Sequence, residues 1–422
     1  MSGSGWGVQY TLTVPTEEAA RDAASELARH GHRLVAVRPH RSSPFELAAW
    51  YGEFSPKAGE GLAGWWQVFS LAVYVAAVER GGGFAERLPA VRPYLNEQAR
   101  YVAEVARSRG GFSDGCAEGH ESTLEKEFDR TGLLHEGAGA LHATDGPASA
   151  SASVPVSGAP PWVWPEPGDP AVLVAAVVEV AERVYGSAEN APEAVAWLLD
   201  EDFAFGEPYE SAADFLADLD DAVAHQGTAL PGTAEAVPFL VAVATEPAVP
   251  VTARVLLLVD LLRHSTAGVS DDVALADRNA ALGRASTETE AQHAVRHAVR
   301  DAVPRLLARW DEASDAERFV LAALAAAHRC GEGPDVTASV RRSDLDALAP
   351  AGTDRADTVA LIEALLRADE TAVAEAVGRL ATRGLGEVRG LHAGPHARTR
   401  DVGVVVLSGL VMRDVGRDLR SL

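Results

Sequence analysis

The sequence contains very little cysteine: Cys116 and Cys330 are the only two in 422 residues. Two cysteines cannot build a disulfide framework, and such scarcity is typical of proteins kept in a reducing compartment. A chain of this length can instead bury a sizeable hydrophobic core. We therefore expect a cytoplasmic protein that is stabilised by packing.

Long apolar runs are missing as well. The longest, 171–178 and 402–406, fall well short of the roughly 20 residues that cross a bilayer. Residues 1–5 have neither the basic start nor the apolar core of a signal peptide. The sequence therefore predicts no membrane partner.

Positive charge is scarce, with 37 Lys and Arg against 61 Asp and Glu and a formal net charge of −24. Nucleic-acid binders need basic surface to neutralise phosphates, so this balance argues against a nucleic-acid partner. Hydrophobic residues make up 47% of the chain, which excludes wholesale disorder. These bounds favour a folded acidic protein, but they identify no activity.

The charge is unevenly distributed, and this divides the chain. Residues 1–120 hold 13 acidic and 12 basic side chains, whereas the remainder holds 48 and 25. Residues 137–169 are rich in Ala, Ser, Pro and Gly, as extended linkers are. We predict an α+β domain over 1–136, a linker over 137–169, and an acidic α-helical domain over 170–422.

The first domain is predicted to mix strands and helices. Apolar and polar residues alternate over 6–12, as in a half-buried strand. Thr16 and Gly31 have the residue types that begin and end helices. Two further strands and a second helix are expected at 34–38, 65–75 and around 95–106. This order predicts a small ferredoxin-like sheet with helices on one face.

Three segments of this domain match a known family. They are Pro15 to Ala20, Leu27 to His32, and Tyr101 to Gly111 followed by Ser113-Asp114-Gly115. In these segments the domain resembles the ribonuclease E inhibitor family (regulator of ribonuclease activity B). That family is a small α+β domain that binds an enzyme and has no catalysis of its own, so the resemblance implies the same fold and a regulatory role. The similarity extends over roughly 5–120, and the chain departs from it between Pro39 and Gly64.

The remainder of the chain has almost purely helical periodicity, with short connections that carry Pro or Gly. We predict helices at 170–184, 191–199, 211–224, 234–244, 251–262, 291–307, 315–327, 354–367 and 370–383.

One helical pair recurs in this region. The segment around Pro238 reappears 66 residues later around Pro304. Arg254 follows the first proline by 16 residues and Arg318 follows the second by 14. Recurring helix pairs are typical of an α-solenoid. The pattern resembles HEAT-type repeats, which implies a protein-binding scaffold with an extended concave face; an unrelated helical bundle is the alternative.

The richest polar stretch supplies three weak metal candidates, Cys116, His120 and His135. Cysteine and histidine are zinc ligands, and His120 is also a conceivable base for a Cys116 nucleophile. However, the chain has neither closely paired cysteines nor a His-Glu-x-x-His motif. We therefore expect residues 116–121 to form a turn before a helix, and we assign no metal, cofactor or catalytic residue.

Further candidates are surface features. Asp218, Asp220 and Asp221 fall on a predicted amphipathic helix and read as a solvated acidic face or a partner-binding site. His293 and His297 are one helical turn apart, which favours two exposed polar residues over a ligand site. In a strand, adjacent residues face opposite sides, so Trp65 and Trp66 make one core residue and one candidate hot spot for a partner.

The absence of a catalytic constellation favours a non-catalytic scaffold that grips a protein partner with a basic surface. One alternative is an immunity or antitoxin-like protein directed against a basic nuclease. Another is an enzyme, either a HEAT-like DNA glycosylase or a metal-dependent hydrolase. The strong negative charge disfavours the glycosylase, because DNA binding needs a basic groove.

Overall fold

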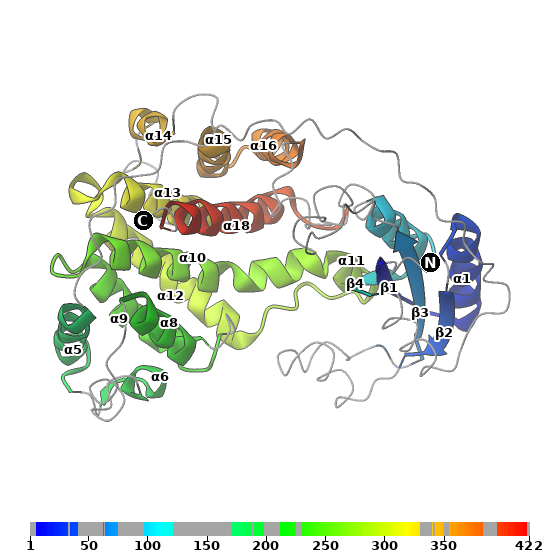
Figure 1. The fold of residues 1–422 in the computed structure, drawn as a ribbon, viewed down its shortest axis with the longest axis horizontal. Helices are drawn as coiled ribbons and strands as arrows, with labels where there is room; N and C mark the ends of the chain where they lie inside the picture. Colours follow the sequence, from blue (N-terminus) through cyan, green and yellow to red (C-terminus); the bar gives the residue numbers. More distant parts are fainter. Residues whose placement is uncertain are drawn as a thin grey trace, which may run out of the picture. The chain divides into compact units, whose positions relative to one another are not determined.

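The chain folds into two compact units in the computed structural model (Figure 1). The α+β unit comprises 1–154, 274–287 and 389–397, and the helical unit comprises 155–273, 288–388 and 398–422. The residues that the structure describes are 6–32, 34–40, 62, 64–74, 97–120, 170–187, 190–197, 212–224, 229–329, 340, 342–349, 354–382 and 395–419.

A four-stranded antiparallel sheet forms the centre of the α+β unit, with the strand order β2-β3-β1-β4. The central strand β1 pairs Trp6 with Tyr74 of β3 and with His120 of β4. The expected strands are confirmed, but the turn expected at 116–121 is wrong over 116–120, which lie in β4. The strands are β1 (Trp6–Val14), β2 (Leu34–Pro39), β3 (Trp66–Tyr74) and β4 (Phe112–His120).

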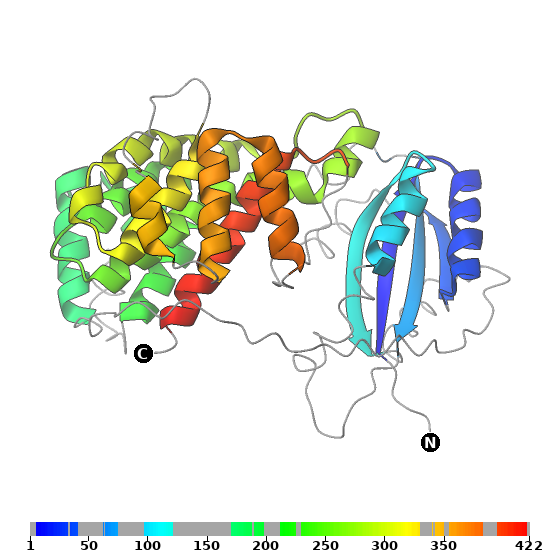
Figure 2. The ribbon, with the colours of Figure 1, turned by 90° about the horizontal axis from the view of Figure 1, so that it is seen from above.

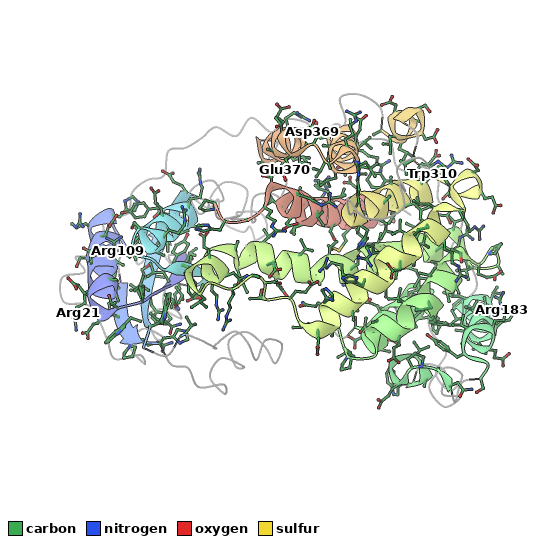
Figure 3. All side chains as sticks on the ribbon, turned by 180° about the vertical axis from the view of Figure 1, so that it is seen from behind. Arg21, Arg109, Arg183, Trp310, Asp369 and Glu370 are labelled. Carbon is green, nitrogen blue, oxygen red and sulfur yellow. The ribbon has the colours of Figure 1, made fainter. Side chains whose placement is uncertain are left out.

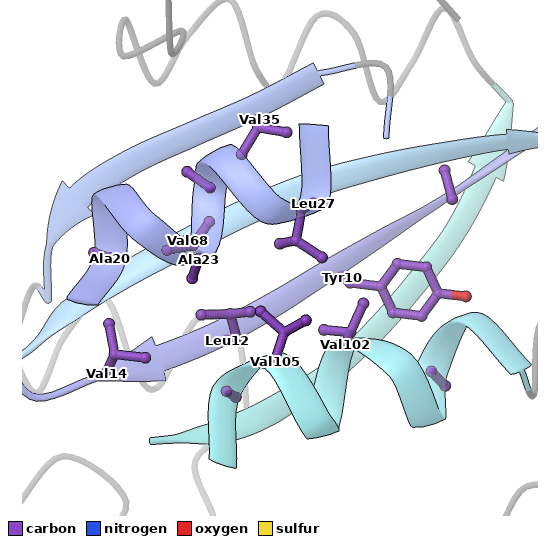
Figure 4. Close-up of a cluster of buried hydrophobic side chains, with 14 of the residues drawn as sticks. Tyr10, Leu12, Val14, Ala20, Ala23, Leu27, Val35, Val68, Val102 and Val105 are labelled. Atoms are coloured by element: carbon purple, nitrogen blue, oxygen red, sulfur yellow. The ribbon is translucent and has the colours of Figure 1, made fainter. Parts of the chain in front are cut away.

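Helix α1 (Glu17–His30) and the helical residues 97–107 cover one face of this sheet (Figure 4). The Thr16 hydroxyl accepts a hydrogen bond from the Ala19 amide, and Gly31 ends the helix with φ 107°. Both predicted helix ends are therefore confirmed. The side chains between sheet and helices form a closed hydrophobic cluster, which includes Tyr10, Leu12, Leu27 and Val102.

The short helix α11 (Ala276–Ala281) lies against β4 and belongs to the same unit. Its buried Arg278 lies 5.5 Å from the ring centre of Phe112, and its Asp277 pairs with Arg107 at 3.1 Å. A segment from the middle of the chain thus completes the α+β unit. The predicted second domain, 170–422, includes this segment, and no sequence signal separates residues 274–287 from their neighbours.

The helical unit confirms that the rest of the chain is mostly helical, with α10 longer than expected and with two unexpected helices, α14 and α18. Helix α12 packs against α9 and α13, and α15 packs beside α16 (Figure 2). The helices are α5 (Pro170–Tyr185), α6 (Glu193–Ala196), α8 (Ala212–Val223), α9 (Thr233–Thr245), α10 (Val251–Ala274), α12 (Glu290–Leu307), α13 (Asp315–His328), α14 (Arg342–Leu348), α15 (Asp354–Arg367), α16 (Glu370–Thr382) and α18 (Thr399–Leu419).

Within the described part of the chain, none of the helices combines the length and apolar character that crossing a bilayer requires.

Candidate functional site

The recurring prolines and arginines occupy equivalent places in two helical hairpins. Pro238 lies inside α9 and Pro304 inside α12, and both rings are exposed. Arg254 is the fourth residue of α10, and Arg318 is the fourth residue of α13. In each pair, the proline therefore lies in the first helix and the arginine lies in the first turn of the second helix.

Both arginines bind the connection that precedes their helix. Arg254 donates from Nη1 to the carbonyl oxygens of Glu246, Pro247 and Val249. Arg318 donates from Nε to the Trp310 carbonyl at 2.9 Å and from Nη2 to the Asp311 carbonyl at 3.1 Å. The Glu246 and Trp310 carbonyls also accept the backbone amides of Val249 and Ala313, so each arginine adds side-chain hydrogen bonds to a connection that already has backbone ones.

Arg254 also forms a buried ion pair, whereas Arg318 pairs with the exposed Asp315. The Nε of Arg254 donates to Glu317 at 2.8 Å, and the two side chains are 10% and 8% exposed. Glu317 also accepts from the amide and hydroxyl of Ser314 in the capping box of α13. Burial opposes ionisation of Glu317, but Arg254 and Ser314 together hold its pKa below the ordinary value. This ion pair joins the start of α10 to the start of α13.

A cluster of four ionisable side chains joins α8 to α10: Asp220, Asp260, Arg263 and His264. We call it the α8–α10 cluster. Asp220 accepts hydrogen bonds from Arg263 and from Nε2 of His264. Arg263 also lies 3.8 Å from Asp260. Positions 260, 263 and 264 share one face of α10 because they are three and four residues apart.

The two carboxylates of this cluster differ in acidity. Burial raises the pKa of Asp260 to about 7; the negative charge of Asp220 adds to the rise and Arg263 opposes it. Burial acts on Asp220 in the same direction, but the hydrogen bonds and charges of His264 and Arg263 bring its pKa below the ordinary value. Near neutral pH, Asp220 is therefore ionised, whereas Asp260 is present in both its protonated and its ionised form.

The geometry of the cluster suits cation recognition better than nucleophilic catalysis. His264 is only 3% exposed, and its Nδ1 is buried without a hydrogen-bond partner, so the ring cannot reach a substrate. Asp260 is 25% exposed and Asp220 19%, so water and a partner's cation can reach both carboxylates. An approaching Lys or Arg would favour ionised Asp260 and pair with it.

Comparison of the chain with protein-family models, with curated proteins and with solved structures finds no match in any of the three.

The predicted partner residues lie in different settings. On α8, Asp221 is exposed and Asp218 is half-buried, whereas Asp220 is engaged by α10. Trp66 packs against the hydrophobic cluster of the α+β unit. The Trp65 ring lies 5.8 Å from that of Phe112. The structure therefore brings only Asp220, of these five, into the α8–α10 cluster.

The weak metal candidates are placed only in part. Cys116 and His120 lie in β4, where their Cα atoms pair with those of Tyr10 and Trp6, but their side chains and the whole of His135 are outside the described residues. Among the residues that are described, no three His, Cys, Asp or Glu side chains converge as metal ligands.

Sequence reasoning missed Asp260, Arg263 and His264. The expected helix ended at 262, because the polar residues that follow suggest a loop. The signal that was available is the spacing of Asp260 and His264, which places a carboxylate and an imidazole one helical turn apart.

Replacing Asp260 with asparagine should stabilise the helical unit at alkaline pH. A raised pKa means that the folded state holds this proton while the unfolded state has released it, so stability falls as pH rises from about 4 to about 7. Asp260→Asn removes that loss. We expect a gain of about 1 to 2 kcal/mol at pH 8 and none at pH 4, measured by urea unfolding.

Asp221→Asn is the matched control for this pH dependence, because Asp221 is an exposed carboxylate of α8. We expect its stability to stay within about 0.5 kcal/mol of the parent at both pH values. An equal gain for Asp260→Asn at pH 4 and pH 8 would contradict the assigned acidity.

Proposed function

We propose that this protein is a non-catalytic scaffold whose helical unit stacks HEAT-like hairpins and binds a protein partner with a basic surface. The observation that carries the proposal is the equivalent role of Arg254 and Arg318, each of which binds the connection within its own hairpin. Two hairpins built the same way and packed through α9 and α12 are the minimal unit of a stacked repeat. Such stacks offer extended surfaces to macromolecules.

The α+β unit is proposed as a second binding module of the ferredoxin-like type. The strand order β2-β3-β1-β4, with α1 between β1 and β2 and a helix between β3 and β4, supports this assignment. We extend to it the regulatory role that the resemblance to the ribonuclease E inhibitor family implies. The unit would then bind an enzyme without contributing catalysis.

The electrostatics of the helical unit specify the partner's chemistry. The chain after residue 120 holds 48 acidic and 25 basic side chains. Asp260 belongs to the α8–α10 cluster, and Asp218 and Asp221 lie on α8 within two residues of Asp220, which is itself hydrogen-bonded to Arg263 and His264. We therefore place the partner's Lys and Arg side chains at Asp218, Asp221 and Asp260, where complementary charge speeds encounter and selects orientation.

The test uses the full-length protein and a partner captured by cross-linking from the native lysate at low salt, then purified. Asp218→Lys with Asp221→Lys should weaken binding of that purified partner at least tenfold, because two attractions become two repulsions. Binding of the parent should also weaken steeply between about 50 and 200 mM salt, where charges become screened. Isothermal titration calorimetry measures both effects.

Glu370→Lys with Glu375→Lys is the matched control. It makes the same change in net charge on α16, where Glu370 is exposed at the start of the helix (Figure 3). The proposal predicts nearly unchanged binding for this control. Equal loss in both double variants would reduce the interaction to net charge, and full binding by the α8 variant would reject the assigned surface. If the captured partner is a basic nuclease and this protein inhibits it, the alternative function, an immunity protein, is supported.

A further inference from the structure

The outward face of α12 presents two imidazole nitrogens at one point. His293 is exposed and His297 is half-buried, and their Nε2 atoms lie 3.0 Å apart. The ring centres are 4.2 Å apart and the rings are inclined at 40°. The residues are one helical turn apart, so the backbone of a regular helix keeps them adjacent.

The helix that carries this pair is well anchored. Thr289 and Gln292 form a capping box at its start, in which each residue's side chain accepts from the other's backbone amide. The side-chain amide nitrogen of Gln292 also donates a hydrogen bond to the Asp271 carboxylate of α10 at 2.7 Å. His293 therefore follows a fixed first turn, and little conformational freedom of the backbone is lost when the two rings share a ligand.

The neighbouring arginines are each matched by a carboxylate. Arg296 binds both oxygens of Glu288, at 2.8 and 2.6 Å, and Arg300 binds Asp301 at 3.0 and 2.9 Å. Burial lowers the pKa of His297, and the charges of Arg300, His293 and Arg296 lower it further. A neutral imidazole keeps one nitrogen lone pair, which is the form of histidine that binds metals.

The separation of the two Nε2 atoms, which is the length of the hydrogen bond between them, also matches the spacing of two ligands on one ion. With metal–nitrogen bonds of about 2.05 Å, two ligands at 90° lie about 2.9 Å apart, whereas two at the tetrahedral angle lie about 3.3 Å apart. The observed 3.0 Å is close to the right-angle value. Right-angled nitrogen pairs are typical of square-planar or tetragonal Cu²⁺ and Ni²⁺ sites.

We propose that His293 and His297 form a two-histidine chelate for a divalent copper or nickel ion. Both ions bind imidazole nitrogen well, and Cu²⁺ binds most tightly among the first-row divalent metals. No third His, Cys, Asp or Glu among the described residues converges on the pair, so within that part of the chain the site has two protein ligands. Without metal, one imidazole donates its Nε2–H to the other.

The experiment titrates the full-length protein with Cu²⁺ near pH 7.5 and records electron paramagnetic resonance together with histidine ring signals in the NMR spectrum. We expect two equivalent nitrogen couplings and early paramagnetic broadening of the His293 and His297 signals. His293→Gln and His297→Gln should each weaken this site at least about tenfold, because the second contact of a chelate gains from a high effective concentration.

His396→Gln is the matched control, since His396 is an exposed histidine outside α12. It should leave the two-nitrogen signal unchanged. Circular dichroism confirms that each variant remains folded, so that loss of the signal reports lost ligands. Retention of the two-nitrogen signal in the His293→Gln/His297→Gln double variant would overturn the proposal, as would broadening of other histidines before His293 and His297.

Discussion

Arg254→Met should lower the free energy of unfolding of the helical unit by about 3 to 5 kcal/mol. Arg254 and Glu317 are 10% and 8% exposed and form an ion pair at 2.8 Å. Removing one partner of a buried pair leaves the other charge without compensation, which costs far more than losing an exposed pair. The backbone carbonyls of Glu246, Pro247 and Val249 also each lose the hydrogen bond from Arg254. Urea unfolding followed by circular dichroism measures the change.

Two companion variants separate the ion pair from the hairpin contact. Arg318 makes the equivalent carbonyl contacts but is 29% exposed and pairs only with the exposed Asp315. Arg318→Met should therefore cost about 1 kcal/mol. Adding Glu317→Gln to Arg254→Met should recover part of the loss, because glutamine removes the unpaired charge and still suits the capping box. Equal costs for Arg254→Met and Arg318→Met would show that the ion pair contributes nothing.

Gly111→Ala should destabilise the α+β unit by about 3 kcal/mol or more. A Cβ atom at Gly111 would lie 2.2 Å from the carbonyl oxygen of Thr13 and 2.7 Å from Cγ1 of Val14. The first of these atoms is backbone of the central strand β1, which cannot move without disturbing the sheet, so the overlap must be relieved by distorting β1 or β4. Hydrogen exchange of the β1 amides in the full-length protein reports this loss locally.

Its neighbour Gly110 provides a control with a different physical limit. The φ angle of Gly110 is +71°, and the nearest atom to an added Cβ is a proline carbon 3.9 Å away. Gly110→Ala therefore meets only the conformational cost of a left-handed residue, about 1 kcal/mol. If the β1 amides are as well protected from exchange in Gly111→Ala as in Gly110→Ala, Gly111 does not approach β1 as closely as described.

Structural features that depend on residues close together in the sequence were predicted correctly. Thr16 and Gly31 mark the ends of α1 correctly because capping depends on residues within a few positions. The helices of the second unit are predictable for the same reason, since their apolar stripes have helical period. The register of β1 between β3 and β4 cannot be read from local pattern, because the paired residues are 52 to 114 positions apart in the sequence.

Two failures have a common physical cause, which is stabilisation by distant residues. The sequence of β4, which contains Gly115 and Gly119 and no β-branched residue, is a poor strand in isolation, and pairing with β1 overrides that propensity. The second half of α10 reads as a loop because it contains His264, Ser265 and Thr266. These polar residues are buried, and Ser265 and Thr266 find partners in His328 and Ser408.

In the candidate site too, local features were predictable from the sequence and features that depend on distant residues were not. Asp220 was recognisable as part of an acidic helix, but its engagement with Arg263 and His264 depends on α8 meeting α10. The acidity of Asp260 is equally invisible in sequence, because burial and the charge of Asp220 produce it. The Pro238/Arg254 and Pro304/Arg318 pairs were recognisable because two segments of the same sequence can be compared directly with each other.

The insertion of α11 has a consequence for the order of folding during synthesis. Strand β4 ends at His120, whereas the segment that lies against it begins at residue 274. Because a ribosome releases the chain from its N-terminus, the earliest strands emerge long before Arg278 can reach Phe112. A nascent chain arrested before residue 274 should thus display a sheet with part of one face still bare, open to chaperones until translation proceeds.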